Sequence, residues 1–169
     1  SHSAFIACAL AEYIRSLGYE ARAHHATNYQ VVLPPILLWA GLGEMSRMGD
    51  VVLNPFLGPR FKAAVVTTSL PLAVDKPIDA GIMQFCKACK KCAEACPSQS
   101  LSFDTEPTWT VRGPWNNAGH KAYFENSVSC MTYWREKATT NCGICFGVCP
   151  FAKKDKAWIH EWVKAGSAV

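Results

Sequence analysis

The first pattern along the chain is an apolar stripe at helical spacing. Ser3 precedes it as a possible N-cap and Gly18 follows it as a stop signal, so the pattern predicts an amphipathic helix over residues 3–17. Because Tyr13 lies on this stripe, we expect it to pack in the core. Cys8 has no cysteine nearby in the sequence, and we expect it to be a small buried residue. The stripe consists of Phe5, Ile6, Ala9, Leu10, Tyr13, Ile14 and Leu17.

Shorter elements follow this helix. Residues 19–26 fit a short strand, and two consecutive prolines fit the first turn of an apolar helix over about residues 34–42. Glycines and prolines between residues 41 and 60 predict an irregular stretch, and β-branched residues at 61–70 predict a further strand. The first part of the chain is therefore expected to mix helix and strand.

The composition changes near residue 79, where we expect a boundary. Residues 71–77 are typical of a linker, and the closely spaced cysteines begin beyond it. Residues 105–126 are rich in Trp, Pro, Gly and Asn without periodicity, which predicts a long ordered loop. Apolar residues within 157–164 indicate the start of another helix. We therefore expect three segments, at residues 1–79, 80–155 and 156–169.

Composition and charge narrow the function classes. Half of the 169 residues are hydrophobic and 18% are charged, which is a globular composition. The net charge of +4 is mild and its lysines are local, so no nucleic-acid partner is predicted. The longest apolar stretch, at residues 31–40, is short and contains two prolines, so it predicts no transmembrane helix. No targeting signal is visible in the sequence.

The cysteines carry the candidate chemistry. Cys86, Cys89, Cys92 and Cys96 precede Pro97 in a C-x2-C-x2-C-x3-C-P motif. A second motif, C-x2-C-x3-C-P, consists of Cys142, Cys145, Cys149 and Pro150. Both spacings are typical of 4Fe-4S clusters of bacterial ferredoxin type. Such clusters transfer one electron at a time, so the sequence predicts an electron-transfer segment.

In the first motif the three thiolates of the C-x2-C-x2-C segment can face one cubane, so the cysteine before proline is expected to bind the other cluster, and the same exchange is expected in the second motif. Cluster one would then take Cys86, Cys89, Cys92 and Cys149. Cluster two would take Cys96, Cys142, Cys145 and one remote cysteine. Thr139 stands where a two-cluster ferredoxin would have that remote ligand, so we expect Cys130 to replace it.

Two other interpretations of the cysteines are less favoured. A structural zinc site takes four tetrahedral ligands, usually as two separated pairs, and the spacing here differs from that. A disulfide framework suits small secreted chains with an even number of cysteines, whereas this chain has nine cysteines and ample apolar residues for a core.

Several further segments form a recognisable order along the chain. They are the run Ala40-Gly-Leu-Gly-Glu-Met-Ser-Arg-Met-Gly49, then Asn54-Pro55, Gly58-Pro59-Arg60 and Phe85-Cys86, and finally Cys142-Gly-Ile-Cys-Phe-Gly-Val-Cys-Pro-Phe151. Together they resemble the reductive dehalogenases. The resemblance implies an α+β fold, in which a ferredoxin-like two-cluster unit is inserted into a nitroreductase-like corrinoid-binding domain. It implies that this chain is an internal piece of such a protein. Residues 1–79 would belong to the corrinoid-binding domain, residues 80–155 to the two-cluster domain, and residues 156–169 would return to the first.

The resemblance also implies a reaction and its site. Members of the family replace a carbon-bound halogen by hydrogen, with electrons passed through two 4Fe-4S clusters to a corrinoid cobalt. By position, Arg60 and Asn28 match the family's catalytic arginine and asparagine, while the proton-donating tyrosine falls outside this chain. Gly41, Gly43 and Ser46 would contact the corrinoid. None of the five histidines lies in a D-x-H-x-x-G motif, so the cobalt is expected to be base-off.

The expected partners are a small organohalide substrate, an electron donor and a small membrane-anchor protein. The expected location is the outer face of the cytoplasmic membrane as a peripheral protein, with the cytoplasm as the alternative. Two other functions stay open. An epoxyqueuosine reductase, which modifies a tRNA nucleotide, joins similar cofactors. A plain two-cluster ferredoxin with an unrelated extension is the other alternative.

Overall fold

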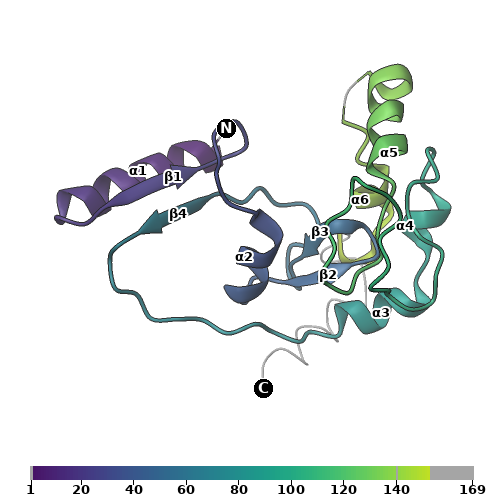
Figure 1. The fold of residues 1–169 in the computed structure, drawn as a ribbon, viewed down its shortest axis with the longest axis horizontal. Helices are drawn as coiled ribbons and strands as arrows, with labels where there is room; N and C mark the ends of the chain where they lie inside the picture. Colours follow the sequence, from purple (N-terminus) through teal and green to yellow (C-terminus); the bar gives the residue numbers. More distant parts are fainter. Residues whose placement is uncertain (1, 140, 153–169) are drawn as a thin grey trace.

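The computed structural model describes residues 2–139 and 141–152, and Figure 1 shows their arrangement. The fold mixes helices with two separate two-stranded antiparallel sheets. Helix α1 (His2–Ser16) lies along strand β1 (Ala21–His24), which pairs with strand β4 (Val65–Thr68). The register of this sheet runs from Ala21 opposite Thr68 to His24 opposite Val65. The expected α+β character of the first segment is therefore observed.

Helix α1 is confirmed, but Ile14 is the one residue of its predicted apolar stripe that is buried. The residues that pack inward are Ala7, Ala11 and Ile14. Tyr13 is 62% exposed and Cys8 is exposed, so neither is a core residue in this chain. The reason is that the small alanines allow close approach of helix and sheet, and two strands cover only one side of the helix. The stripe residues left largely exposed are Phe5, Ile6, Leu10, Tyr13 and Leu17.

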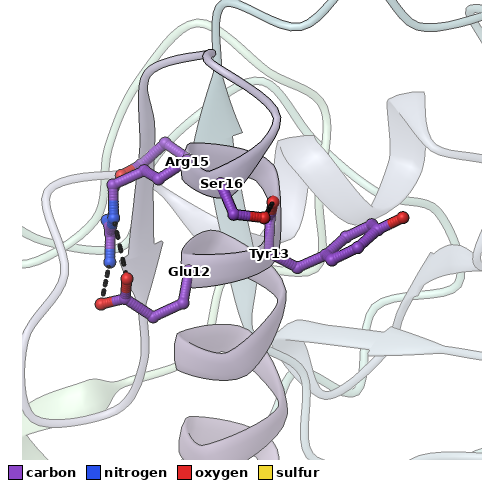
Figure 2. Close-up of polar contacts among 5 residues, drawn as sticks. Glu12, Tyr13, Arg15 and Ser16 are labelled. Carbon is purple, nitrogen blue, oxygen red and sulfur yellow. Dashed lines mark hydrogen bonds and ion pairs between the residues drawn. The ribbon is translucent and has the colours of Figure 1, made fainter.

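Polar contacts stabilise the last turn of α1. Figure 2 shows Arg15 paired with Glu12 on one side of the helix and the Tyr13 ring projecting on the other. The Ser16 hydroxyl donates to the carbonyl of Tyr13 at 2.7 Å, and Gly18 ends the helix with φ of +90°. A left-handed conformation there favours glycine, as the sequence predicted.

The middle of the chain contains a hairpin that the sequence did not predict. After helix α2 (Leu33–Trp39), strand β2 (Glu44–Ser46) pairs with strand β3 (Gly49–Leu53) across a two-residue turn. Helix α2 was expected, with its prolines in the first turn. The hairpin was missed because β2 has only three residues and the glycines around it are typical of loops.

Gly43 is held next to the hairpin by a close backbone approach. A Cβ atom at this position would lie 2.2 Å from the carbonyl oxygen of Leu53. We expect Gly43→Ala to destabilise the protein by more than the roughly 1 kcal/mol of an ordinary glycine substitution, because two backbones would have to separate. Thermal denaturation of the variant tests this. Gly147→Ala is the matched control, since Gly147 lacks a left-handed φ and a Cβ atom there would meet only the end of the Arg60 side chain, at 3.8 Å; equal losses in the two variants would contradict the prediction.

Residues 82–152, here called the cysteine-rich segment, consist of short helices joined by ordered loops. An extended stretch at residues 71–80 leads from β4 past α2 to α3 (Ile82–Ala88), as Figure 1 shows. The predicted long loop at 105–126 has only an isolated bridge between Thr108 and Ala122. The remaining helices are α4 (Lys91–Glu94), α5 (Ser127–Tyr133), the π-helical turn η1 (Trp134–Ala138) and α6 (Ile144–Val148). The helix predicted at 157–164 lies outside the described residues.

One core joins the β2–β3 hairpin to the cysteine-rich segment. Leu53 and Ile82 are fully buried, and Phe151 is 1% exposed. The hairpin thus packs on residues beyond the expected boundary near residue 79, and that boundary stays a prediction. In the part of the chain that the structure describes, no helix combines the length and apolarity needed to span a bilayer.

Candidate iron-sulfur centres

The first cavity gathers four thiols from three parts of the chain. Helix α3 contributes Cys86 and ends at Cys89, helix α4 contributes Cys92, and Cys149 follows α6. Cys86, Cys92 and Cys149 are buried, with exposures of 7–8%. The cavity is narrow and its wall is otherwise mostly apolar, completed by Ser46, Arg47, Met48, Leu53, Phe85, Pro150 and Phe151. These four thiols are the set that the spacing predicts for cluster one.

The second cavity gathers the other four thiols and has a volume of about 500 Å³. Cys96 follows α4, Cys130 lies on α5, and Cys142 and Cys145 flank the start of α6. Helix α5 begins at the Asn126 N-cap, whose side chain accepts from the Ser129 amide, and this places Cys130 one turn further along. The four thiols are the set predicted for cluster two, including the remote ligand.

Electrostatic interactions divide the thiols in the same way. Burial raises the pKa of Cys92 to about 12, and the neighbouring Cys86, Cys149 and Cys89 add to this. Burial raises the pKa of Cys145 to about 11, with further contributions from Cys96, Cys130 and Cys142. Thiols that raise one another's pKa lie close together, because each disfavours a second negative charge nearby.

Cys96 is the exception, and a chain of serine hydroxyls explains it. Burial raises its pKa, but hydrogen bonds from Ser98 and Ser100 outweigh burial and the net pKa is lowered. The Ser98 hydroxyl lies 3.4 Å from the Cys96 sulfur, and the Ser100 amide donates to the same sulfur at 3.4 Å. The hydroxyls of Ser98, Ser100 and Ser129 continue the chain at 2.6 and 2.7 Å. Hydrogen bonds to a ligand sulfur stabilise the thiolate that a cluster needs.

Raised thiol pKa values predict a steep pH dependence of metal binding. At pH 7 the thiols of Cys92, Cys145 and Cys149, with pKa values of about 11 to 12, carry protons that iron must displace. The apparent affinity of the metal-free protein for iron(II) should therefore rise at least about tenfold from pH 7 to pH 8. Anaerobic iron titrations at the two pH values measure this. Cys92→Ala should show a shallower rise, and an affinity independent of pH would refute the prediction.

The donor chemistry fits clusters better than a single metal ion. Among the described residues, no three His, Cys, Asp or Glu side chains converge on one mononuclear position. A cubane does not require such convergence, because each thiolate binds a separate iron at its own corner. Four thiols around each of two cavities therefore match the ligand set of two 4Fe-4S clusters.

Arg47 is a site residue that the sequence analysis missed. It is fully buried, and its guanidinium lies beside the first cavity. The residue stands within the glycine-rich run that resembles the dehalogenases. A lone arginine between a strand and a glycine usually lies at the surface, so nothing in the local pattern indicated its burial.

The structure places Arg60 and Asn28 in different surroundings. Arg60 is exposed, and its guanidinium would lie 3.8 Å from a Cβ atom at Gly147 on α6. Asn28 is exposed in the turn after β1, where it pairs with His25 and its Oδ1 accepts from Arg22 at 3.4 Å. Neither side chain lines the two cysteine cavities. Their catalytic roles stay predictions.

The three expected corrinoid contacts have neighbours within the chain itself. A Cβ atom at Gly41 would lie 2.6 Å from the carbonyl oxygen of Lys76, and Gly43 is held against Leu53. The buried Ser46 hydroxyl donates to the Val51 carbonyl at 2.8 Å and accepts from the Met48 amide at 3.2 Å. Packing of the hairpin therefore accounts for these small residues, and their contact with a corrinoid stays a prediction.

Comparison with known proteins agrees with the geometry. Residues 85–152 match the family model of the 4Fe-4S double cluster binding domain, and they contain all eight cysteines of the two cavities. The tetrachloroethene reductive dehalogenase of Sulfurospirillum multivorans is 38% identical over 155 residues, which cover 92% of this chain. The chain is homologous to the reductive dehalogenases. It spans about 30% of the length of the curated relatives that it matches.

A solved structure supports the same homology. A reductive dehalogenase whose structure suggests a mechanism for B12-dependent dehalogenation is 36% identical. It superposes with a TM-score of 0.81 over 93% of this dehalogenase homologue and 22% of its own chain. The predicted α+β fold with a two-cluster segment is confirmed, while the nitroreductase-like corrinoid domain stays a prediction. The epoxyqueuosine reductase of Lactococcus garvieae is more distant, with 30% identity over 72% of this chain.

Proposed function

We propose that the whole protein is a corrinoid-dependent reductive dehalogenase, which replaces a carbon-bound halogen by hydrogen. One observation carries this proposal. Eight thiols form two groups of four within a chain whose homology to reductive dehalogenases extends over both the cysteine-rich segment and the helix and strands before it. A plain ferredoxin would account for the thiols but not for the homology of the preceding residues.

We assign the two cavities to the two clusters. Cluster one takes Cys86, Cys89, Cys92 and Cys149, and cluster two takes Cys96, Cys130, Cys142 and Cys145. In this arrangement Cys92 on α4 and Cys96 just after it bind different clusters. The same holds for Cys145 on α6 and Cys149 at its end. The exchange supports electron transfer between the clusters, because ligands four residues apart keep the clusters close.

The corrinoid would supply the carbon-halogen chemistry when bound. We propose Arg60 and Asn28 as catalytic residues that face it in the whole protein, with the proton donor supplied by a tyrosine outside this chain. No ion pair occupies Arg60 in the described part of the chain, so its charge is available to stabilise an anion. We propose Gly41, Gly43 and Ser46 as corrinoid contacts. The two glycines would contact it through backbone atoms because they carry no side chain.

The proposed partners follow from this reaction. A small organohalide is the substrate, and an electron donor reduces the clusters from outside. The further proposal is a small membrane-anchor protein that holds the enzyme at the outer face of the cytoplasmic membrane, with the cytoplasm as the alternative location. The mild net charge of this chain fits a small substrate better than a tRNA.

Halide release by the full-length protein tests the function. The protein is reconstituted anaerobically with iron, sulfide and a cobamide, and is then given a low-potential reductant and a panel of chlorinated and brominated alkenes, alkanes and aromatics. We expect halide release that requires both the cobamide and the reductant, and that is lost in Cys92→Ala. Bound cobamide and clusters without halide release, together with reduction of an epoxyqueuosine-containing stem-loop, would overturn the proposal.

A further inference from the structure

Arg47 carries a positive charge into the interior, and no carboxylate among the described residues forms an ion pair with it. Its side chain is 0% exposed, and neither ion pair found among the described residues involves it. Every hydrogen bond that it donates goes to a backbone carbonyl. Nε donates to Cys86 and Cys89 at 3.0 Å each, Nη1 to Ser102 at 2.8 Å and Asp104 at 2.6 Å, and Nη2 to Cys86 at 2.6 Å and Lys87 at 3.3 Å.

The aromatic ring of Tyr123 completes the surroundings of this guanidinium. The central carbon of Arg47 lies 4.3 Å from the centroid of the ring, within the range of a cation–π interaction. Carbonyl dipoles and a ring quadrupole satisfy the donors. The carboxylates of Asp104 and Glu106 are close enough to raise the pKa of Tyr123, but neither forms an ion pair with Arg47 in the described part of the chain. Burial of an unpaired cation is costly, so a full negative charge nearby is expected.

The first cavity is where such a negative charge would lie. Arg47 lines it together with Cys86, Cys89, Cys92 and Cys149. The guanidinium already favours the thiolate forms of Cys86 and Cys92, although burial dominates and raises the pKa of both. A cluster held by four thiolates would place its charge in the same cavity, and reduction would increase that charge.

We propose that Arg47 is a positioning residue for cluster one, with two effects. Its hydrogen bonds fix the C-terminal end of α3 from Cys86 to Cys89, and its permanent charge stabilises the reduced cluster and so raises the cluster's midpoint potential. In the step concerned, the cluster takes one electron from the external donor and gains one negative charge, with no bond formed or broken. The inference rests on the proposed ligand set for cluster one.

Redox titration followed by electron paramagnetic resonance tests this inference on the full-length reconstituted protein. The signal lost in Cys92→Ala identifies cluster one. In Arg47→Gln, which removes the charge and keeps two of the five N–H donors, we expect the equilibrium constant for reduction of cluster one to fall about tenfold, a midpoint potential lower by about 59 mV. Arg47→Lys keeps the charge and should restore most of the wild-type potential.

Arg15→Gln is the matched control for the loss of one positive charge. Arg15 is exposed on α1 and pairs with Glu12 outside the cysteine-rich segment, so its loss should leave both potentials unchanged. An unchanged or higher potential for cluster one in Arg47→Gln, with full iron content, would overturn the inference. If Arg47→Gln fails to hold the cluster, Arg47→Lys decides: retention of the cluster supports the role of the charge, and its loss refutes it.

The outcomes separate this inference from the proposals on which it rests. Full iron content in Cys92→Ala would refute the proposed ligand set of cluster one. It would leave the dehalogenase function, which halide release by the wild-type protein tests, unaffected. If the cluster-one potential shifts as predicted in Arg47→Gln but the wild-type protein releases no halide, the dehalogenase function is refuted. The role of Arg47 in setting the cluster-one potential then stands. With Cys92→Ala behaving as expected, an unchanged or higher cluster-one potential in Arg47→Gln, or loss of the cluster in Arg47→Lys, counts against Arg47 itself.

Discussion

Replacing Cys130 by alanine should lower the iron content of the reconstituted protein from about eight to about four atoms per chain, because one of two 4Fe-4S clusters loses a ligand. Of the four cysteines around the second cavity, Cys130 alone lies outside both cysteine motifs. It is placed there by α5, and its pKa is raised by burial and then by the charges of Cys96 and Cys142. Chemical analysis of iron and sulfide after anaerobic reconstitution measures the loss.

Cys8→Ala is the matched control for this substitution. Cys8 is the remaining cysteine of the chain, and it is exposed on α1, away from both cavities. It should retain all the iron. An undiminished iron content in Cys130→Ala would show that another ligand completes cluster two, and would remove Cys130 from the assignment. Loss of iron in both variants would point to misfolding instead of ligation.

The ligand pattern was accessible from the sequence because it is local. The spacing of the two motifs predicts which thiolates face one cubane, and the proline after each motif predicts which cysteine faces the other. The choice of Cys130 followed from the missing ligand at Thr139. The structure brings Cys130 to the second cavity through α5 and the serines around Asn126, contacts that no spacing could indicate.

Which side chains are buried was harder to predict from the sequence, because burial depends on parts of the chain that are distant in sequence. The period of α1 predicts a helix, but the face that packs is set by β1 and β4, which are brought together over more than forty residues. Tyr13 was therefore assigned to the wrong environment. Arg47 was missed for the same reason, since its acceptors at Cys86, Ser102 and Asp104 come from beyond the linker. Long-range pairing decides such positions, whereas local propensity decides the helices.

Replacing Phe151 by alanine should destabilise the cysteine-rich segment by about 3–5 kcal/mol, the usual cost of removing a buried phenylalanine. Phe151 is 1% exposed, and its ring meets that of Phe85 edge-to-face, with centroids 5.3 Å apart and planes at 89°. Both rings line the first cavity beside Cys149. The midpoint of denaturant-induced bleaching of the cluster absorbance, recorded anaerobically, measures the change.

Phe103→Ala provides the comparison, since Phe103 belongs to the same segment but is 51% exposed. Its truncation should cost less than about 1 kcal/mol, because little apolar surface returns to water and no cavity forms. The difference between the two variants isolates packing at the cluster from general loss of hydrophobic surface. If Phe151→Ala bleached at the same denaturant concentration as Phe103→Ala, the wall formed by Phe85 and Phe151 would not be what protects cluster one. The apolar enclosure of the first cavity would then have to come from the hairpin side, where Met48 and Leu53 face the same thiols.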